Sequence, residues 1–508
     1  MKRIALHRPD SWDLLYFALA LLSGALLILV FPKYDLRFLA PFALAPLLFV
    51  SAQTEGPLTR FGFGWAAGIF YWFGVCTWIQ FVLEVHGGME KWAAWGAFLL
   101  FCVLKALHLA LFSTLAGPLL YRWYALPSIA ALWVGLERTH GTFGFAWLAL
   151  GNAGVDMSIP LRLAPFVGVY GVSFVLMMLS VALAAVALRQ PRRYLLPLLS
   201  LPLLLLLPAV PLGIPAQERA LVVQPNVDPE TEWTFASRLE LEKRLLALST
   251  SLPANLVVWP ELPAPLYYYE DQDFHDAAGQ LARRQHFFLF GTVAYTDRRE
   301  PLNSAVLLGP DGNPAGRYDK IFLVPFGEFI PPAFSWVSRI THEIGDFVPG
   351  HDSNVLVAGP NQLGVFICYE SAFPHLVRQL PLHGADVLLN LSNDGYFGHS
   401  AAREQHLSLV RMRAVENRRF IVRSTNDGIT AAIDPAGRVL KKLPAYTQVA
   451  ALMPYAGVAD TTFYTRHGDW FAWSCLAIGL FASLQTEFAT RRNKPVSEAR
   501  SRSRQQEH

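Results

Sequence analysis

The stretch GVFICYES, Gly364–Ser371, runs from apolar residues straight into a cysteine, a tyrosine and a glutamate. A short run with branched and aromatic side chains is typical of a buried β-strand. Cys368 follows this run directly, so its thiol is expected at the end of a core strand, where Tyr369 and Glu370 begin a polar site. The chain has 4 cysteines and no CxxC spacing, which indicates neither a zinc site nor a disulfide framework. Cys368 alone among them has polar neighbours, which favours a nucleophile, although a buried inert thiol is the commoner role of a cysteine.

Similar apolar runs recur on both sides of this stretch and alternate with segments of helical periodicity. The strand-like runs are ALVVQPNV (220–227), NLVVWPE (255–261), FFLFGTVAY (287–295), SAVLLGP (304–310) and ADVLLNLS (385–392). The helical segments are 238–249, 274–285 and 402–419, and GPDGNPAG and DPAGR have the composition of hairpin turns. This alternation predicts a globular α/β domain over residues 214–466, long enough to bury a core.

The chain as a whole is too apolar for an ordinary soluble protein. Of 508 residues, 53% are hydrophobic and 16% charged, and the mean hydropathy is +0.31, which favours a membrane protein. The net charge of +3 gives no support to nucleic-acid binding, which needs a concentrated basic face. A helix needs about 20 apolar residues to cross a hydrocarbon core. Spans are predicted near Trp12–Phe31, Phe38–Ala52, Phe61–Leu83, Trp92–Leu115, Pro127–Leu136, Leu163–Leu188, Leu195–Leu212 and Trp470–Phe488, and the second and fifth are short.

These patterns divide the chain into four parts. We predict a seven-span transmembrane domain (1–213), the α/β domain (214–466), an eighth transmembrane helix (467–488) and a basic, disordered tail (489–508). No small-residue cleavage site follows the first apolar run, which argues against a signal peptide.

The distribution of Lys and Arg between the spans predicts the orientation. The positive-inside rule assigns the richer set of loops to the cytoplasm, together with the tail, and so puts the α/β domain outside. The richer set contains Lys2, Arg3, Arg8, Arg60, Arg122, Arg189, Arg192, Arg193, Arg491, Arg492 and Lys494, and the poorer set contains Lys33, Arg37, Lys91, Arg138 and Arg162.

Three chemically complementary side chains stand at predicted strand ends. Glu261 follows the strand NLVVWP, Lys320 lies in GRYDKIFLVPFGEFIP, and Cys368 ends GVFI. A carboxylate can take the proton of the thiol, and a lysine can lower the thiol pKa and stabilise an oxyanion. The backbone N–H of Tyr369 is a candidate second oxyanion donor. Taken alone, Glu261 could be a turn carboxylate and Lys320 a surface lysine, so the weight rests on their joint occurrence.

The motifs WPE, YDKIFLVPFGE and CYE, in this order, resemble the nitrilase (carbon–nitrogen hydrolase) superfamily with its Glu-Lys-Cys triad. With apolar spans before and after, the whole chain resembles the apolipoprotein N-acyltransferase family, as do LLNLSNDGYFG (388–398) and the segment 402–430. The resemblance implies an α-β-β-α sandwich beside a multi-span helical membrane domain.

The resemblance also implies roles for individual residues. Glu261 would be the general base, Lys320 the oxyanion stabiliser and Cys368 the nucleophile. Supporting or substrate-binding roles would fall to Glu328, which would orient the lysine, and to Tyr369, Glu370 and Trp233. Structural alternatives remain for three of them: Glu328 and Glu370 could be salt-bridge partners, and Trp233 could anchor a helix or pack at the membrane interface. One departure stands at Gly395-Tyr396, where the family commonly has Ala-Trp.

The implied reaction is ping-pong acyl transfer in a bacterial inner membrane, with the catalytic domain in the periplasm. Cys368 would take an acyl chain from a phospholipid, with phosphatidylethanolamine the expected donor. The thioester would then acylate the N-terminal diacylglyceryl-cysteine of an apolipoprotein, the last step of lipoprotein maturation. Neither a metal nor another cofactor is expected, because no cluster has metal-ligand spacing and the nucleotide motifs GxxxxGK[ST] and GxGxxG are absent.

Two other functions are compatible with parts of the pattern. A membrane-tethered amidase would use the same triad with water as the second nucleophile. A transporter or lipoprotein-binding scaffold would have a catalytically dead α/β domain, although such a domain has no need of all three triad residues. Lys105 and His108 lie within an apolar span, where ionisable groups are often functional. We expect them instead to face the bundle interior and pair with Glu84 or with loop carbonyls.

Overall fold

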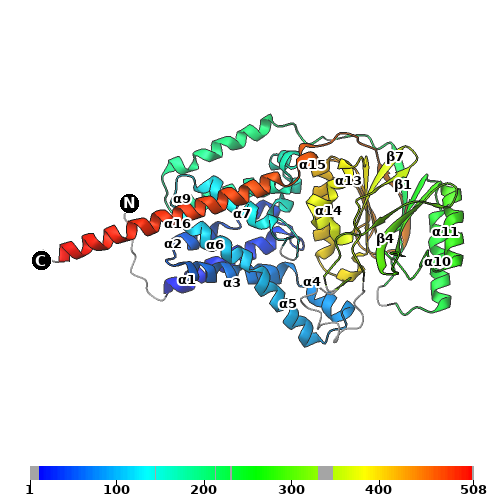
Figure 1. Cartoon of the computed structure of the whole chain (residues 1–508), viewed down its shortest axis with the longest axis horizontal. Coiled ribbons are helices and arrows are strands. Elements are labelled where there is room, and N and C mark those ends of the chain that lie inside the picture. Colours follow the sequence, from blue (N-terminus) through cyan, green and yellow to red (C-terminus); the bar gives the residue numbers. More distant parts are fainter. Residues whose placement is uncertain are drawn as a thin grey trace.

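The computed structural model describes residues 11–142, 145–211, 213–228, 231–325, 327–329 and 347–505. A helical part and a β-sandwich lie end to end along the long axis of the molecule (Figure 1). The helical part is built from the N-terminal 206 residues together with the last helix, so both ends of the sandwich sequence connect to it. This arrangement confirms the predicted combination of a helical membrane domain and an α/β domain.

The helical part contains long helices interrupted by short 3-10 and π-helical turns. The α-helices are α1 (Ser11–Val30), α2 (Ala45–Gln53), α3 (Pro57–Val75), α4 (Trp78–Phe81), α5 (Lys91–Lys105), α6 (Leu107–Leu119), α7 (Ala125–Arg138), α8 (Ala164–Val167), α9 (Val169–Ala187) and α16 (Trp470–Gln505). The other helical segments are η1 (Arg37–Leu39), η2 (Val82–His86), η3 (Leu150–Asp156), η4 (Pro160–Leu163) and η5 (Arg192–Leu206).

Several of these helices could cross a membrane. Four segments qualify by length and composition, and a fifth does if α3 and the bent continuation α4–η2, at 60° to it, form one broken span. They correspond to the first, third, fourth, sixth and eighth predicted spans, whereas α2, α7 and η5 are shorter. The count of eight spans therefore stays a prediction. Helix α16 continues to Gln505, through the basic segment predicted to be disordered, since extending a helix that is already formed costs little.

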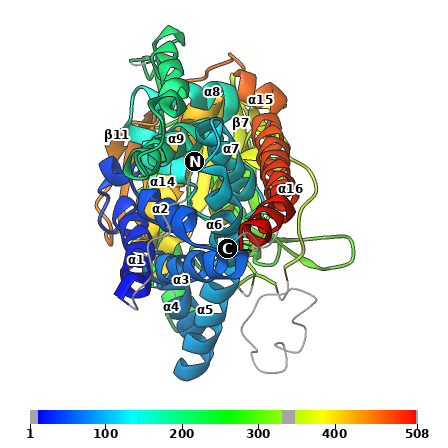
Figure 2. The same ribbon diagram turned by 90° about the vertical axis from the view of Figure 1, so that its left-hand side faces the viewer.

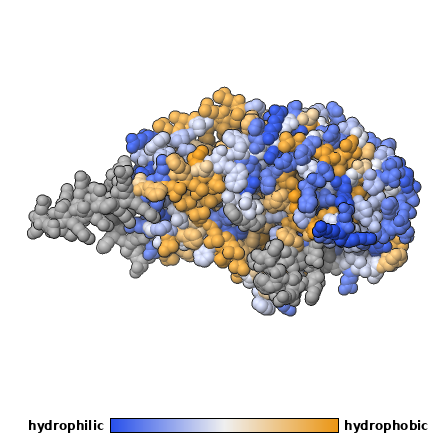
Figure 3. All heavy atoms as spheres, viewed as in Figure 1, coloured by the Kyte–Doolittle hydropathy of each residue, from blue (hydrophilic) through white to orange (hydrophobic). Residues whose placement is uncertain are grey.

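Close packing joins the last helix to the N-terminal bundle. A Cβ atom added at Gly135 of α7 would lie 2.4 Å from the Cα of Leu476, and one at Gly479 of α16 would lie 2.5 Å from the Cα of Leu132. Such close backbone approach is typical of helices in membranes, where small residues form the interface. Figure 2 shows α16 running along one side of the bundle, with α6 among the other helices. Hydrophobic side chains gather over this part in Figure 3, and hydrophilic ones over the far end of the sandwich.

The sandwich consists of two six-stranded sheets, whose strand orders are β12-β1-β2-β3-β4-β5 and β11-β10-β9-β8-β7-β6. All six strand-like runs named from the sequence form strands, and GPDGNPAG and DPAGR connect β4 to β5 and β10 to β11, as predicted. The strands are β1 (Glu218–Gln224), β2 (Leu256–Val258), β3 (Phe287–Tyr295), β4 (Pro301–Leu308), β5 (Pro314–Asp319), β6 (Val355–Ala358), β7 (Asn361–Ile367), β8 (Val387–Ser392), β9 (Ile421–Thr425), β10 (Ala431–Ile433), β11 (Val439–Lys442) and β12 (Val449–Tyr455).

Alternate residues of each strand point to different cores. In β1, Val222 belongs to the core between the two sheets, whereas Leu221 and Val223 pack under the helices outside the first sheet. Those helices are α10 (Phe235–Ser249) and α11 (Gln272–Gln285), and the second sheet is covered by α12 (Pro374–Val377), α13 (Gln379–Leu382) and α14 (Ala402–Asn417). The order is helix, sheet, sheet, helix, as the resemblance implied.

Helix α14 lies between the second sheet and the helical part, and both of its faces are buried. Glu416 accepts hydrogen bonds from Nε and Nη2 of Arg413, at 2.6 and 2.8 Å, and from the backbone N–H of Val169 at the start of α9, at 2.8 Å. Arg413 also donates to the carbonyl of Ser371, at 3.0 Å. Arg413 is 1% exposed and Glu416 is fully buried, so a buried ion pair stands where α14 is bonded to the start of α9.

The sandwich sequence contains two aromatic stretches, and they differ in how far the structure describes them. Most of FGEFIPPAFSWVSRI (326–340), which the sequence predicts to be a mobile arm at the lipid surface, lies outside the described residues. PLYYYEDQ (265–272), predicted to be a second arm, has a buried centre: Tyr268 stacks on His275 at 4.5 Å and lies 5.5 Å from the ring of Phe290. The mobility of both arms stays a prediction.

Glu416→Gln is expected to lower the free energy of unfolding by about 3 kcal/mol, because it leaves the buried guanidinium of Arg413 without its counter-charge. Thermal or denaturant unfolding of the detergent-solubilised protein measures this. Glu404→Gln is the matched control, since Glu404 is exposed on the same helix, and its effect is expected within about 0.5 kcal/mol. Equal stability of the two variants would contradict a dry ion pair at this junction.

Candidate active site

The strand directions bring the predicted site residues to one edge of the sandwich. Strand β2 is parallel to β3, and β4 is antiparallel to both β3 and β5, so β2 and β5 end at the same edge of the first sheet. Strands β7 and β8 are parallel to each other in the second sheet. Glu261 follows β2, Lys320 follows β5 and Cys368 follows β7, which confirms their expected positions at strand ends.

The ammonium group of Lys320 lies between two carboxylates. Its Nζ donates to Oε1 of Glu261 and to Oε1 of Glu328, each at 2.9 Å. Asn303, on β4, donates from Nδ2 to the same two oxygens, at 2.8 and 2.6 Å. The backbone N–H of Asn393, directly after β8, donates to Oε2 of Glu261 at 3.0 Å, so the carboxylate of Glu261 spans both sheets.

This charged cluster is almost dry. Lys320 is 1% exposed and Glu261 6%. Burial alone would lower the pKa of Lys320, but the negative charges of Glu261, Glu328 and the Cys368 thiolate outweigh it and raise that pKa well above its ordinary value. Lys320 is therefore a permanent cation at this site, as an oxyanion stabiliser requires.

A close backbone approach holds Glu261 in place. The N–H of Gly291, on β3, donates to the carbonyl of Pro260 at 3.2 Å. A Cβ atom at Gly291 would lie 2.7 Å from the Cα of Glu261 and from the N of Leu262. Because these neighbours are backbone atoms, a side chain at Gly291 would displace Glu261.

The nucleophile candidate has an unusual backbone conformation. Cys368 begins the 3-10 turn η7 (Cys368–Ala372) with φ = 50°, a left-handed conformation that is uncommon for a residue with a side chain and is often found at functional sites. The carbonyl of Cys368 accepts a hydrogen bond from Nε2 of His406, on α14, at 2.9 Å. The sharp turn after β7 is therefore supported from behind by that helix.

The environment of the Cys368 thiol disfavours its charged form. Burial, and next the negative charge of Glu261, raise its pKa well above the ordinary value, while the positive charge of Lys320 and a hydrogen bond to Ser392 lower it. A thiol of this kind is unreactive until a base takes its proton. Among the carboxylates near it, Glu261 has the largest effect on the thiol pKa. The structure thus brings the three predicted triad residues together.

The residues after the cysteine form the walls of the site. Glu370 accepts hydrogen bonds from the hydroxyl of Tyr318 and from the backbone N–H groups of Ile321 and Ile367, at 2.6–2.9 Å. Burial raises the pKa of Glu370 to about 7, although these hydrogen bonds oppose the shift. Glu370 therefore ties the turn after Lys320 to the turn of the nucleophile. Tyr369 instead points to the helical part, where its hydroxyl accepts from the N–H of Ala146 at 3.0 Å.

The remaining predicted residue lies apart from this cluster. Trp233 is half-buried just before α10 and packs against the core between the first sheet and its covering helices. This position agrees with the alternative that Trp233 anchors the start of a helix. Its place in substrate binding stays a prediction.

Tyr396, at the departure from the family pattern, lies beside the triad. Its side chain is 47% exposed, yet the protein around its hydroxyl, together with the charges of Glu261 and Glu328, raises its pKa to about 12. Its ring lies 4.5 Å from the ring of His86 at the end of η2. An amphipathic ring thus stands at the point where the helical part meets the site.

Three groups of this site were not predicted from the sequence. Asn303 interrupts an apolar strand with a buried amide, and a polar residue in such a run is the signal that could have identified it. Asn393 contributes only its backbone N–H, for which no signal exists in the sequence. His406 is buried in α14, within reach of the Asp394 carboxylate at 3.0 Å and of the Cys368 carbonyl.

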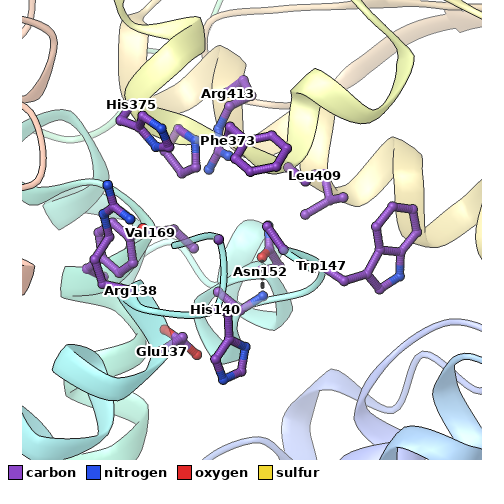
Figure 4. Close-up of a pocket in the computed structure, with 16 residues that line it drawn as sticks. Glu137, Arg138, His140, Trp147, Asn152, Val169, Phe373, His375, Leu409 and Arg413 are labelled. Carbon is purple, nitrogen blue, oxygen red and sulfur yellow. Dashed lines mark hydrogen bonds between the residues drawn. The ribbon is translucent and has the colours of Figure 1, made fainter. Parts of the chain in front are cut away.

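A small cavity lies nearby, between the helical part and the turn after Cys368 (Figure 4). Its volume is ≈ 30 Å³, enough for about two water molecules. Phe373, His375 and Arg413 line it from the sandwich, and Glu137 and Asn152 from the helical part. Among the described residues that line it, none belongs to the triad, so this cavity borders the site without containing it.

Neither Lys105 nor His108 belongs to the triad. As expected, Lys105 faces the bundle interior and donates to a loop carbonyl, that of Phe145, at 2.8 Å. His108 contacts the hydroxyl of Thr139 at 3.2 Å, and Glu84 is hydrogen-bonded to Gln80. Within the described part of the chain, no group of three or more His, Cys, Asp or Glu side chains could hold a metal ion.

The chain is similar to known proteins over nearly its whole length. Residues 219–453 match the family model of carbon-nitrogen hydrolases, and residues 23–182 match that of the apolipoprotein N-acyltransferase N-terminal domain. The apolipoprotein N-acyltransferase of Geobacter metallireducens is 34% identical over 490 residues, which cover 91% of this chain and 93% of that protein. That of Nitrosomonas europaea is 34% identical over 469 residues, covering 89% of this chain and 93% of its own length.

Solved structures similar to the chain cover about half of it. A mutant of the amidase from Nesterenkonia sp. has a TM-score of 0.37 and 20% identity, covering 50% of this chain and 96% of that chain. A carbon-nitrogen hydrolase from Helicobacter pylori has a TM-score of 0.36 and 18% identity, covering 46% and 88% of the two chains.

Lys320→Met is expected to slow the alkylation of Cys368 by iodoacetamide. The variant removes a positive charge that lowers the thiol pKa, so the pKa rises and the reactive thiolate becomes scarcer at any given pH. One pKa unit corresponds to a tenfold change, so we expect alkylation at pH 8 to be at least about tenfold slower and its pH profile to move upward. Peptide mass spectrometry measures the modification of Cys368.

Lys243→Met, at an exposed lysine of α10, is the control for this experiment and should leave the rate unchanged. A pH profile of Cys368 alkylation that is the same in Lys320→Met as in the unmodified protein would contradict the electrostatic contact between the two side chains.

Proposed function

The chain belongs to the apolipoprotein N-acyltransferase family, and on this premise we propose that Glu261, Lys320 and Cys368 carry out its acyl transfer. The protein is a membrane-bound acyltransferase with a carbon–nitrogen hydrolase domain. The amidase alternative is not favoured, because the N-acyltransferase relatives match both the helical part and the sandwich. One observation supports the proposed triad above all others: a buried ammonium is paired with a carboxylate, and both act on the thiol at the strained turn.

The first half-reaction forms a thioester. The carboxylate of Glu261 takes the thiol proton of Cys368, and the sulfur attacks the ester carbonyl carbon of a phospholipid. The ammonium of Lys320 and the N–H of Tyr369 stabilise the oxyanion. When the tetrahedral intermediate collapses, the C–O bond breaks, and the lysophospholipid oxygen leaves with the proton held by Glu261.

The second half-reaction transfers the acyl chain to nitrogen. The free α-amino group of the diacylglyceryl-cysteine of an apolipoprotein attacks the thioester carbonyl. Glu261 accepts a proton from the attacking nitrogen. The C–S bond then breaks, and the departing Cys368 thiolate takes that proton back from Glu261. An amide and the free enzyme result, so a single base serves both halves.

Glu328 positions the cation in both steps. Its Oε1 holds Lys320 and its Oε2 accepts from the N–H of Val324 at 2.8 Å, so it is anchored to backbone. With Asn303 it fixes the ammonium while Glu261 exchanges protons. When Glu261 is protonated, the ion pair with Glu328 remains, and the buried cation keeps a counter-charge.

The location of the site near apolar helices supports a lipid as acyl donor, and we propose phosphatidylethanolamine. Phe397, on the 3-10 turn η8 (Asp394–Phe397) next to Tyr396, packs against Trp78 of α4, with ring centroids 4.9 Å apart. The amphipathic rings of Trp78 and Tyr396 prefer the membrane interface, where the ester groups of phospholipids lie. An ester group at that level would be close to the triad.

The two sets of basic residues support an inner membrane location with the sandwich in the periplasm. Arg37 and Arg138 pair with Asp156 and Asp469 at the end of the helical part that meets the sandwich. Arg60 donates to the carbonyl of Thr54 at the start of α3, one helix length away from that end. The positive-inside rule then assigns the Arg60 end to the cytoplasm.

Incubation of the purified protein with phosphatidylethanolamine, without acceptor, is expected to add one fatty acyl mass to the peptide that contains Cys368. Adding a diacylglyceryl-cysteine peptide should remove that mass and leave an acylated peptide. Mass spectrometry detects both products. Cys368→Ala should form neither, whereas Cys475→Ala, on α16, should behave like the unmodified protein. An unmodified Cys368 in an enzyme that still acylates the peptide would refute the covalent route.

Glu261→Gln is expected to lower the single-turnover rate of thioester formation by about 10²–10⁴-fold, the usual contribution of general base catalysis. The amide keeps the shape of the side chain and one acceptor oxygen, but it cannot take the thiol proton. Glu300→Gln, at an exposed carboxylate of the same domain, is the control. A Glu261→Gln rate within threefold of the unmodified enzyme would exclude Glu261 as the base.

A further inference from the structure

We propose that Lys105, buried in the helical part, is a positioning residue for the nucleophile, because its ammonium holds the 145–149 loop against Tyr369. This inference rests on the proposed role of Cys368 and adds a residue from outside the sandwich to its support.

The 145–149 loop has no regular secondary structure, so side chains determine its conformation. Nζ of Lys105 donates to the carbonyl of Phe145 at 2.8 Å. The next residue, Ala146, donates its N–H to the hydroxyl of Tyr369 at 3.0 Å. Two hydrogen bonds and one peptide unit therefore connect the ammonium to the residue directly after Cys368.

Ring packing follows the same path. The ring of Phe145 stacks on that of Tyr369, with centroids 5.5 Å apart and 19° between the planes. Phe373, at the end of the nucleophile turn, meets the other side of the Tyr369 ring at 5.0 Å, nearly perpendicular to it. Tyr369 is thus fixed between the loop and the turn, and a displacement of the loop would move it.

The same loop also reaches the support behind Cys368. Nε1 of Trp147 donates to Oε1 of Gln405 at 2.8 Å, and Nε2 of Gln405 donates to the carbonyls of Pro32 and Val75, at 2.8 and 3.1 Å. The next residue on α14 is His406, which donates to the Cys368 carbonyl. The loop therefore contacts the nucleophile turn from two directions.

In the described part of the chain, Nζ of Lys105 is held by a neutral carbonyl and not by an acidic side chain. Among the described residues, no carboxylate lies within ion-pair distance of its Nζ, which instead lies 4.9 Å from the ring centroid of Trp72. Lys105 is 6% exposed, and a cation in an apolar bundle is costly. The hydrogen bond to the Phe145 carbonyl therefore gives this buried polar group a partner that it would otherwise lack.

The test compares Lys105→Met with Arg60→Met in the full-length protein with phosphatidylethanolamine as donor. Arg60 also donates to a backbone carbonyl, at the far end of α3, so the two variants lose the same kind of bond. The readout is the single-turnover rate constant for acylation of Cys368, per folded molecule, beside the melting temperature. Lys105→Met is expected to lose about 10- to 100-fold in this rate constant, since a misplacement of about 1 Å can cost 10²-fold. Arg60→Met should stay within twofold.

A double-variant cycle with Tyr369→Phe separates positioning from general damage. If Lys105 acts through Tyr369, the double variant should be no slower than the slower of the two single variants. Losses that multiply would overturn the inference, as would a Lys105→Met rate within twofold of the unmodified enzyme. If Lys105→Met does not fold, Lys105→Gln replaces it in the cycle under the same criteria, because its side chain is one bond shorter and withdraws the donor from the Phe145 carbonyl.

Thioester formation in the unmodified enzyme distinguishes a failure of the proposed function from a failure of the proposed role of Lys105. Absence of a thioester on Cys368 in the unmodified enzyme would refute the proposed function. A thioester that forms equally fast in Lys105→Met would refute only the role of Lys105.

Discussion

The active site depends on one buried cation, the ammonium of Lys320 between the carboxylates of Glu261 and Glu328. Removing an ion from water costs several kcal/mol even after the protein relaxes, so such a group persists only when counter-charges and hydrogen bonds surround it. Here Asn303 donates to the same two carboxylate oxygens as the ammonium, and the N–H groups of Asn393 and Val324 satisfy the other two. This requirement fixes the ends of β2, β5 and β8 relative to one another, because each end supplies one member of the cluster.

The nucleophile is attached to this cluster by a second buried carboxylate, that of Glu370. Its oxygens accept from backbone groups on both sides, before Cys368 and after Lys320. The distance between thiol and ammonium is therefore set by backbone contacts, which move less than side chains do. The same burial that makes the arrangement rigid raises the thiol pKa, so the site keeps an inert thiol until Glu261 takes its proton. A reactive thiolate exposed at rest would be open to oxidation, which follows thiolate character and exposure.

The helical part contributes to this site as well as attaching it to the membrane. Helix α14 is buried on both faces, with Glu416 bonded to the start of α9 and Gln405 to carbonyls of the N-terminal helices. The 145–149 loop contacts Tyr369 and the neighbour of His406. Because these bonds lie in a water-poor interface, the hydrogen-bonding groups have few alternative partners. The bonds therefore fix the position of the sandwich relative to the helical part. An acyl donor that arrives from the membrane thus meets a site whose walls are partly built by the membrane domain.

The sequence by itself determined the local elements and the order of the chemistry. The runs around Val257 and Val365 are strands because their composition suits a buried sheet whatever surrounds it, and the hairpin turns follow from their Gly and Pro residues. The proposed triad could be named from the sequence because Glu261, Lys320 and Cys368 stand in motifs long enough to be recognised. Tertiary structure decided what those motifs contact. Asn303, the N–H of Asn393 and His406 reach the site from elements distant in the chain. The helix α14, which reads as charged, proved largely buried because Arg413 pairs with Glu416. The hydrophobic periodicity of a segment indicates whether its residues prefer water or a core. The partner of a buried charge depends instead on which segments the fold brings together.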